Sequence, residues 1–263
     1  KGYGLWWSLG WAAANLSEPL VGATVTKRLT PSLGLNRRAA AAVVVGGLII
    51  GPTIGATIGA ATLEIGNNST WTTAFPDIWS GDALGVLVVA PVALVVARPR
   101  LLPPPGPART LDALTLSALL ALAGVLFWTT DNAAVAYGSI PLLAWTTMRV
   151  GARGLAIAAL ALASMSTAAT ARGRGPWGSL DGVDPQTQLG RQQLFLLAAI
   201  GGAWLLTLEV RERARAVERM RSVATDAALL ERALHAGRMG VWTWDARTKA
   251  IGCDRQLEEL YGV

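Results

Sequence analysis

The chain has 263 residues, of which 52% are hydrophobic and only 15% are charged. A water-soluble protein of this length needs more charged side chains on its surface, so the composition indicates a protein embedded in a lipid bilayer. The net charge is +6, but the basic residues form small clusters between apolar stretches and not one stripe. We therefore expect neither a nucleic-acid partner nor a soluble enzyme.

The sequence offers few groups for catalysis or metal binding. It has one cysteine, Cys253, and one histidine, His235. These are too few for a disulfide framework or a histidine- and cysteine-based metal site. Phosphate-binding, nucleophile-elbow and zinc-protease motifs are also missing from the sequence. We expect no catalytic residue and no metal site in this chain, and the sequence leaves any cofactor unknown.

Seven apolar stretches follow one another along the chain, and most reach the roughly 17 to 25 residues that a membrane-spanning helix needs. They cover residues 5–29, 39–63, 78–97, 111–129, 135–150, 155–171 and 189–210. The fifth is the shortest. The sequence therefore predicts an all-α integral membrane protein, a polytopic helical bundle with about seven visible transmembrane helices.

The connections between these stretches alternate in charge. Cytoplasmic connections of membrane proteins carry an excess of lysine and arginine. Basic clusters lie at residues 27–38, 98–109, 149–153 and 211–221. The connections 64–77 and 129–134 carry neither lysine nor arginine. We expect a multi-pass protein with a cytoplasmic C-terminus, in which Arg172, Arg174 and Arg191 are exceptions on the outer side.

Glycines recur every four residues in the second stretch, at positions 47, 51, 55 and 59. This spacing places Gly47, Gly51, Gly55 and Gly59 along one side of a helix, where another backbone can approach closely. We interpret them as helix-packing residues, with a kink expected at Pro52.

Polar side chains at membrane depth are candidates for function because burying them in hydrocarbon is costly. Asn15 and Glu18 lie three residues apart in the first stretch, and Trp79 and Asp82 open the third. Together with Arg149, they are our candidate residues for ligand binding or signal coupling. Two simpler interpretations stay open, namely a polar clasp between helices for Asn15 and Glu18, and a first-turn helix acid for Asp82.

After the last apolar stretch the composition changes. Residues 211–236 are rich in arginine and glutamate, and they predict a helical linker. Apolar residues recur at alternating spacings of three and four, at Met220, Val223, Ala227, Leu230 and Leu234. This pattern is typical of a short coiled coil, which would make the protein a homodimer. A single amphipathic helix is the alternative.

Residues 237–263 form a third segment. Residues 241–244 and 250–253 predict two strands, residues 245–248 the turn between them, and residues 255–260 a helix start. A hairpin and one helix cannot bury a core, so we expect this segment to be the start of a larger domain.

Several strings of the first 213 residues resemble a known family. They are NLSEPLVGA at 15–23, WSGDALGVLVVAPVAL at 79–94, IPLLAWTTMRVGARG at 140–154 and RGRGPWG at 172–178. These strings, in this order, resemble the type-one membrane-associated sensor (MASE) domain of bacterial signalling proteins. The string GVWTWD at 240–245 is similar to the opening of a PAS domain, and the structure implied there is an α/β fold.

The resemblance implies an eight-helix sensor in the bacterial inner membrane, with one helix preceding Lys1. It divides the chain into a sensor domain at 1–210, a linker at 211–236 and a PAS start at 237–263. Such chains usually continue into a diguanylate cyclase, a histidine kinase or a phosphatase. The chain itself is then a signal-input domain and not an enzyme, with the bilayer, an unknown stimulus ligand and a second copy as its partners.

A different class of function is also compatible with the sequence. Glycine-rich and proline-broken helices with polar groups at Asn15 and Glu18 occur in secondary transporters and channels. No internal repeat supports this alternative, and transport does not require the charged linker helix. A haem protein is less compatible, because no histidine lies in an apolar stretch.

Overall fold

The computed structural model describes residues 4–31, 36–66, 69–97, 110–132, 134–180, 182–237 and 239–262. The chain divides into two compact units, Lys1–Val210 and Arg211–Val263. The basic connection that the sequence places at 98–109 lies outside the described residues.

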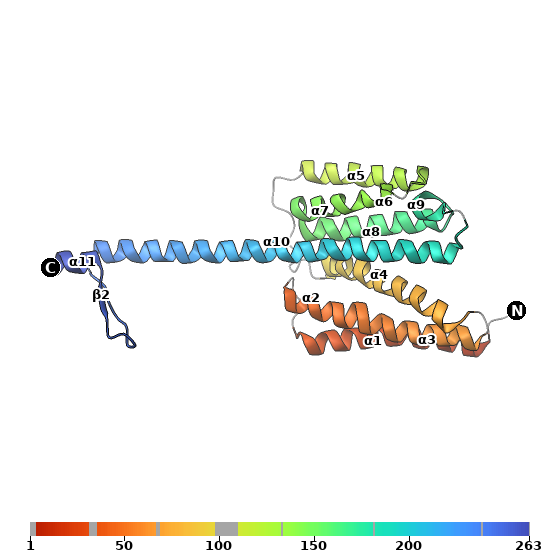
Figure 1. Cartoon of the computed structure of the whole chain (residues 1–263), viewed down its shortest axis with the longest axis horizontal. Coiled ribbons are helices and arrows are strands. Elements are labelled where there is room, and N and C mark those ends of the chain that lie inside the picture. Colours follow the sequence, from red (N-terminus) through yellow and green to blue (C-terminus); the bar gives the residue numbers. More distant parts are fainter. Residues whose placement is uncertain are drawn as a thin grey trace. The chain divides into compact units, whose positions relative to one another are not determined.

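The first unit is a bundle of helices (Figure 1). Its N-terminal part consists of α1 (Leu5–Leu29), α2 (Arg37–Val43), a π-helical segment η1 (Val44–Ile50), α3 (Gly51–Ile65) and α4 (Trp71–Ala97). Helix α3 packs against α1 on one side and α4 on the other.

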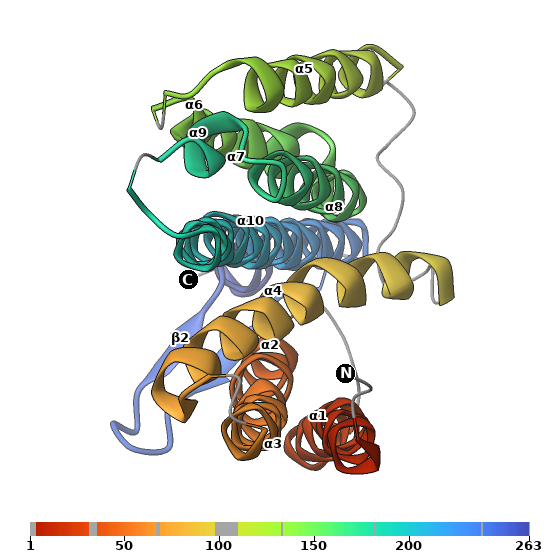
Figure 2. The same cartoon turned by 90° about the vertical axis from the view of Figure 1, so that its right-hand side faces the viewer.

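The C-terminal part of this unit packs around α8. It consists of α5 (Thr110–Thr129), α6 (Ala134–Tyr137), α7 (Ser139–Arg149), α8 (Gly151–Thr170), α9 (Gly175–Gly178) and the first part of α10 (Pro185–Ala236). Helix α8 presents many alanines, which let α4, α5 and α7 approach it closely. Leu155 and Leu162 of α8 are fully buried in one cluster with Leu196 and Ile200 of α10. Both views show α10 between α8 and α4 (Figure 2).

Five helical segments of the described residues are long and apolar enough to cross a membrane. They are Arg37–Ile65, Trp71–Ala97, Thr110–Thr129, Gly151–Gly178 and Pro185–Ala236. The first predicted stretch forms the 25-residue helix α1, which carries Glu18, Lys27 and Arg28. The fifth is divided at Gly138 into the short helices α6 and α7. The prediction of a helical membrane protein is confirmed.

The kink expected at Pro52 takes the form of a wider turn just before it. In the π-helical segment the backbone N–H of Gly51 donates to the carbonyl of Gly46, five residues back. Pro52 has no N–H to donate, and its ring would clash with the carbonyl four residues earlier in a regular α-helix. The wider turn removes this conflict, so the helix continues through the proline.

The second unit contains the C-terminal part of α10, the strands β1 (Trp242–Trp244) and β2 (Ile251–Cys253), and α11 (Arg255–Tyr261). The two strands form the hairpin that the sequence predicts, and they pair antiparallel with Thr243 opposite Gly252. Asp245 accepts hydrogen bonds from the backbone N–H groups of Arg247 and Thr248 in the turn, which holds the pKa of its carboxyl below the usual range. Asp254 caps α11 by accepting from the backbone N–H of Leu257.

Candidate functional site

Two carboxyl groups meet in the first unit. Glu18 of α1 and Asp82 of α4 are side-chain hydrogen-bond partners, and both are half-buried. The structure thus brings together two candidate residues that are 64 positions apart in the chain.

Glycine makes room for this pair. A methyl group at Gly55 of α3 would lie 3.1 Å from Cβ and 3.2 Å from Oε2 of Glu18. One turn earlier, a methyl group at Gly51 would lie 3.1 Å from the backbone oxygen of Glu18. Gly51 and Gly55 therefore bring α3 against the turn of α1 that carries the glutamate.

The other two glycines of the series have their nearest contact across α3 with α4, and Gly59 also lies against Trp11 of α1. A methyl group at Gly47 would lie 3.4 Å from Cγ1 of Val86, and one at Gly59 would lie 3.2 Å from Cδ1 of Ile78. Val86 and Ile78 both belong to α4. The series thus serves two helix contacts, because α3 is packed between α1 and α4.

Asn15 and Trp79 are not joined to the carboxyl pair by a hydrogen bond between described residues. Asn15 is exposed on the surface of α1, and Trp79 is half-buried on α4. The interpretation of Asp82 as a first-turn acid is wrong, because α4 begins at Trp71 and contains no acid in its first turn. Asp82 lies about three turns into the helix, beyond the reach of the helix N-terminus.

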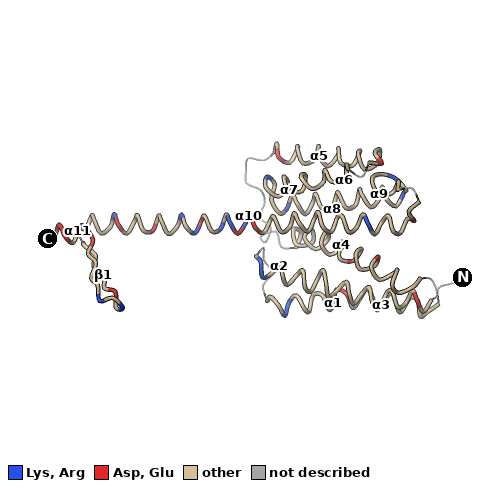
Figure 3. The backbone as a smooth tube through the Cα atoms, in the orientation of Figure 1, with Lys and Arg blue, Asp and Glu red and all other residues tan. Residues whose placement is uncertain are grey.

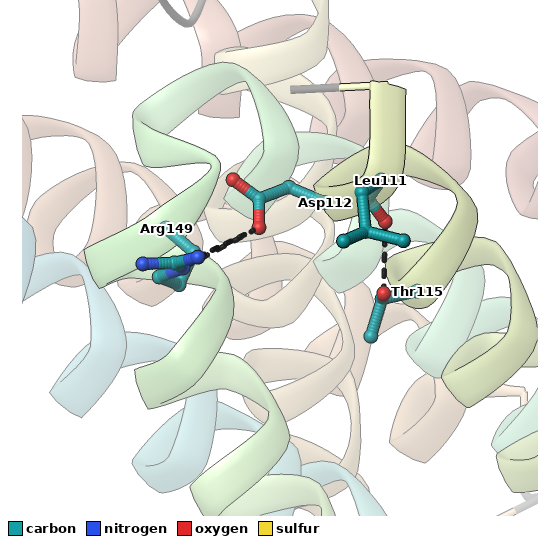
Figure 4. A network of polar contacts seen from close by, with 4 residues as sticks. All are labelled: Leu111, Asp112, Thr115 and Arg149. Carbon is teal, nitrogen blue, oxygen red and sulfur yellow. Dashed lines mark hydrogen bonds and ion pairs between the residues drawn. The ribbon is translucent and has the colours of Figure 1, made fainter. Parts of the chain in front are cut away.

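Arg149 belongs to a separate polar contact (Figure 4). Its Nε and Nη2 each lie 3.3 Å from Oδ1 of Asp112, which is only 7% exposed. Asp112 stands in the first turn of α5 and Arg149 in the last turn of α7. The ion pair therefore joins the N-terminus of α5 to the C-terminus of α7, where each charge also suits its helix dipole.

A line of glutamines on α10 joins this helix to its neighbours. Gln186 donates to Oδ2 of Asp77 at 2.9 Å, and Gln193 accepts from the hydroxyl of Ser80 at 2.8 Å. Both partners belong to α4. Gln192 is fully buried and faces α8, where its Nε2 donates to the hydroxyls of Ser166 at 3.2 Å and Thr167 at 3.1 Å.

Further along α10, a hydrogen bond and an ion pair also join this helix to its neighbours. The hydroxyls of Thr207 and of Thr147 on α7 lie 3.3 Å apart, both buried. Glu209 forms an ion pair of 2.9 Å with Arg37 of α2. We call the contacts of Gln186, Gln192, Gln193 and Thr207 the α10 polar seam. The sequence reasoning missed it, although the string QTQLGRQQ at 186–193 places four glutamines at the start of an apolar helix.

The beginning of α10 is fixed by Asp184. Its carboxylate accepts hydrogen bonds from the backbone N–H groups of Gln186 and Thr187. Hydrogen bonding by Thr187 holds the pKa of Asp184 below its usual range. The carboxylate is thus kept ionised at the helix N-terminus, where the helix dipole favours a negative charge.

The described residues contain no group of three or more histidine, cysteine, aspartate or glutamate side chains that could hold a metal ion. What the bundle does contain is a carboxyl pair and hydrogen bonds between helices, which hold helices in register and can be exchanged at small energetic cost. Fold and site together define a polytopic helical membrane protein with polar contacts between its helices.

Residues 2–201 match the family model described as MASE1. The chain belongs to the MASE1 family, the membrane-associated sensor domain of signalling proteins. No curated protein and no solved structure matches it.

Proposed function

We propose that this chain is the signal-input part of a bacterial inner-membrane signalling protein. The bundle perceives a stimulus, and α10 passes the change through the linker at 211–236 to the PAS start at 237–263 and to an effector beyond it. That effector is a diguanylate cyclase, a histidine kinase or a phosphatase. The observation that carries the proposal is α10, a single helix of 52 residues that contains both a membrane span and the apolar repeat of the linker.

The α10 polar seam supplies the coupling. Hydrogen bonds between membrane helices contribute on average about 0.6 kcal/mol each and at most about 1.7 kcal/mol. A stimulus that binds two arrangements of α10 with affinities differing by a few kcal/mol can therefore exchange one set of bonds for another. A shift or rotation of α10 by a fraction of a turn is the kind of movement expected.

Glu18 and Asp82 are our candidates for the point where the stimulus acts, with Asn15 and Trp79 on the same two helices. A change at the carboxyl pair alters the side-chain contact between α1 and α4, and α4 is bonded to α10 through Asp77 and Ser80. Arg149 is a coupling candidate through its ion pair with Asp112.

The linker is proposed to pair with a second copy. The apolar residues of its repeat are exposed within one chain, with Met220 at 73%, Val223 at 67% and Leu230 at 61%. A parallel coiled coil would bury these side chains in a homodimer. It would also place two output segments side by side.

Cysteine crosslinking in native membranes tests both the pairing of the linker with a second copy and the coupling to the carboxyl pair. In a Cys253→Ser background, we expect Val223→Cys and Leu230→Cys to give dimeric bands, whereas Thr225→Cys and Arg232→Cys, two positions further along and off the repeat, do not. Monomeric protein at both repeat positions would contradict the dimer.

The coupling is tested by adding Glu18→Gln and Asp82→Asn to the crosslinking variants. We expect these changes to alter the ratio of crosslinking at 223 to that at 230. A control change at exposed Thr24 of α1, Thr24→Ala, separates a role of the pair from a role of α1 as a whole. An unaltered ratio in the doubly substituted protein would remove the carboxyl pair from the signalling route.

The alternative of a secondary transporter or channel has one supporting feature, the π-helical segment before Pro52, since interrupted helices are common at transport sites. Purified chain reconstituted into vesicles distinguishes the two. A sensor leaves the permeability to ions and small solutes at the level of protein-free vesicles, whereas a transporter raises it.

A further inference from the structure

Two arginines stand in the short connection between α8 and α9, at the end of the bundle where α5 ends and α10 begins (Figures 2 and 3). Arg172 and Arg174 are both exposed. They are exceptions to the rule that lysine and arginine avoid the outer connections. Neither the carboxyl pair nor the α10 polar seam explains them.

The backbone that carries the two arginines is held by hydrogen bonds. The N–H groups of Arg172 and Arg174 both donate to the carbonyl of Ala169 at 3.0 Å, and that of Gly173 donates to Thr170 at 3.0 Å. Gly175 has a φ of +76°, and a methyl group there would collide with the carbonyl of Phe127. The backbone positions of the arginines are thus set before any ligand arrives, which lowers the entropic cost of binding.

A single indole holds both guanidinium groups. The Cζ atom of Arg172 lies 5.4 Å from the ring centre of Trp128, and that of Arg174 lies 5.9 Å from it. Each contact is a cation–π interaction, which is attractive, but the two positive charges at one ring repel each other. An anion beside them would remove this repulsion.

The donors of the two side chains are largely unused. Among the described residues, Arg172 donates one side-chain hydrogen bond, to the carbonyl of Ala168 at 3.1 Å, and each guanidinium has five N–H donors. Among the residues that the structure describes, no carboxylate forms an ion pair with either arginine. A planar pair of N–H groups fits the two oxygens of a phosphate or carboxylate.

We propose that Arg172 and Arg174, held on Trp128, form a binding site for an oxyanion at the membrane surface. The ligand presents a phosphate or carboxylate group, either as a phospholipid headgroup or as a small anionic solute. The site goes beyond the proposed signalling function and does not depend on it, because anion binding can be measured without any output.

The test uses the purified chain in neutral detergent and in nanodiscs. In detergent, thermal unfolding is followed while sodium phosphate is raised against sodium chloride at equal ionic strength. In nanodiscs, phosphatidylcholine alone is compared with a mixture containing phosphatidylglycerol. The proteins are the wild type, the double variant Arg172→Ala/Arg174→Ala, and Arg28→Ala, which removes an exposed charge from the other end of the bundle.

We expect phosphate to raise the unfolding temperature of the wild type and of Arg28→Ala more than sodium chloride does, or phosphatidylglycerol to raise it more than phosphatidylcholine alone does. In the double variant the apparent affinity should fall by about tenfold or more, because the variant loses the charge-assisted hydrogen bonds of both guanidinium groups to the anion. An effect of phosphate alone identifies a solute site, and an effect of phosphatidylglycerol alone identifies a headgroup site.

The variant Arg172→Lys/Arg174→Lys guards against a folding defect, because it keeps both charges and loses the planar pair of donors. It should bind more weakly than the wild type and unfold at the wild-type temperature without anion. The proposal is overturned if, in the wild type, phosphate raises the unfolding temperature no more than sodium chloride and phosphatidylglycerol no more than phosphatidylcholine alone. It is also overturned if either Arg172/Arg174 variant responds to the anions as the wild type does.

Discussion

At the scale of single residues, glycine decides how closely two helices meet. The added methyl group at Gly51 would face only backbone atoms, namely the oxygens of Glu18 and Gly46 at 3.1 and 3.2 Å and Cα of Gly22 at 3.4 Å. Backbone atoms cannot rotate away as a side chain can. Gly51 therefore allows no substitution without moving α1 and α3 apart.

We predict that Gly51→Ala destabilises the bundle by about 1–3 kcal/mol, the usual cost of overpacking. Gly85→Ala is the matched control, because a methyl group at Gly85 of α4 meets nothing within 4 Å. That change should be neutral or stabilising, since alanine is the better helix former by about 1 kcal/mol. Thermal unfolding in detergent measures both, and an equal effect of the two would refute the close packing at Gly51.

Asp112 and Arg149 show a second role of single residues, the joining of helix ends. The carboxylate of Asp112 is buried, whereas the side chain of Arg149 is 61% exposed. Because water screens the exposed partner, the coupling between the two should be about 1 kcal/mol or less.

A double-mutant cycle of Asp112→Ala and Arg149→Ala, measured by thermal unfolding, should give this coupling free energy at low salt. The coupling free energy should be smaller at high salt. Arg149→Lys should retain part of it. A coupling of zero at low salt would show that the pair does not help to hold α5 against α7.

At the scale of elements, α10 is positioned by polar bonds as well as by apolar packing. Gln192 is fully buried, and its Oε1 has no hydrogen-bond partner among the described residues, while its Nε2 bonds to α8. A buried amide oxygen without a donor costs free energy, so an arrangement of α10 that gave this oxygen a donor would regain that cost.

We predict that Gln192→Leu changes the crosslinking ratio between Val223→Cys and Leu230→Cys, because it removes the bonds of α10 to Ser166 and Thr167. The control is Arg191→Leu, which adds an apolar side chain at the exposed neighbouring position. If both changes act alike, the effect comes from added hydrophobicity and not from the α10 polar seam.

Element boundaries were largely predictable. The predicted stretch at 5–29 coincides with α1, and 111–129 differs from α5 by one residue. The start of α4 was misplaced, because Thr72, Thr73 and Asp77 interrupt the apolar pattern that marks a helix, while their backbone remains helical. The split of the fifth stretch at Gly138 was not predictable from hydropathy, which does not register a break between two short helices.

At the scale of the whole molecule, the distribution of lysine and arginine predicts orientation. The end of α1, the start of α2 and the end of α7 carry Lys27, Arg37 and Arg149. These helix ends lie at one end of the bundle, which we expect to be cytoplasmic together with the C-terminus (Figure 3). The opposite end carries the connection at 69–70 and the short helix α9.

Cysteine labelling in intact cells measures this orientation. In the Cys253→Ser background, a membrane-impermeant maleimide should label Ser69→Cys from outside, and Ser222→Cys only after the membrane is opened. The reverse pattern would invert the topology and would move the oxyanion site to the cytoplasmic face. Equal labelling of both positions in intact cells would show that the membrane had leaked.

The sequence by itself determined that this protein lies in a lipid bilayer, that it is helical and where most of its helices lie. The reason is that burial of apolar side chains in a bilayer depends on local composition and length alone. Only the tertiary structure decided which polar groups meet. Glu18 contacts Asp82, Arg149 pairs with Asp112, and Gln192 donates to Ser166, because the fold brings together segments that are far apart in the chain. Such pairing depends on the rotation and register of each helix against its neighbours, and hydropathy carries little information on either.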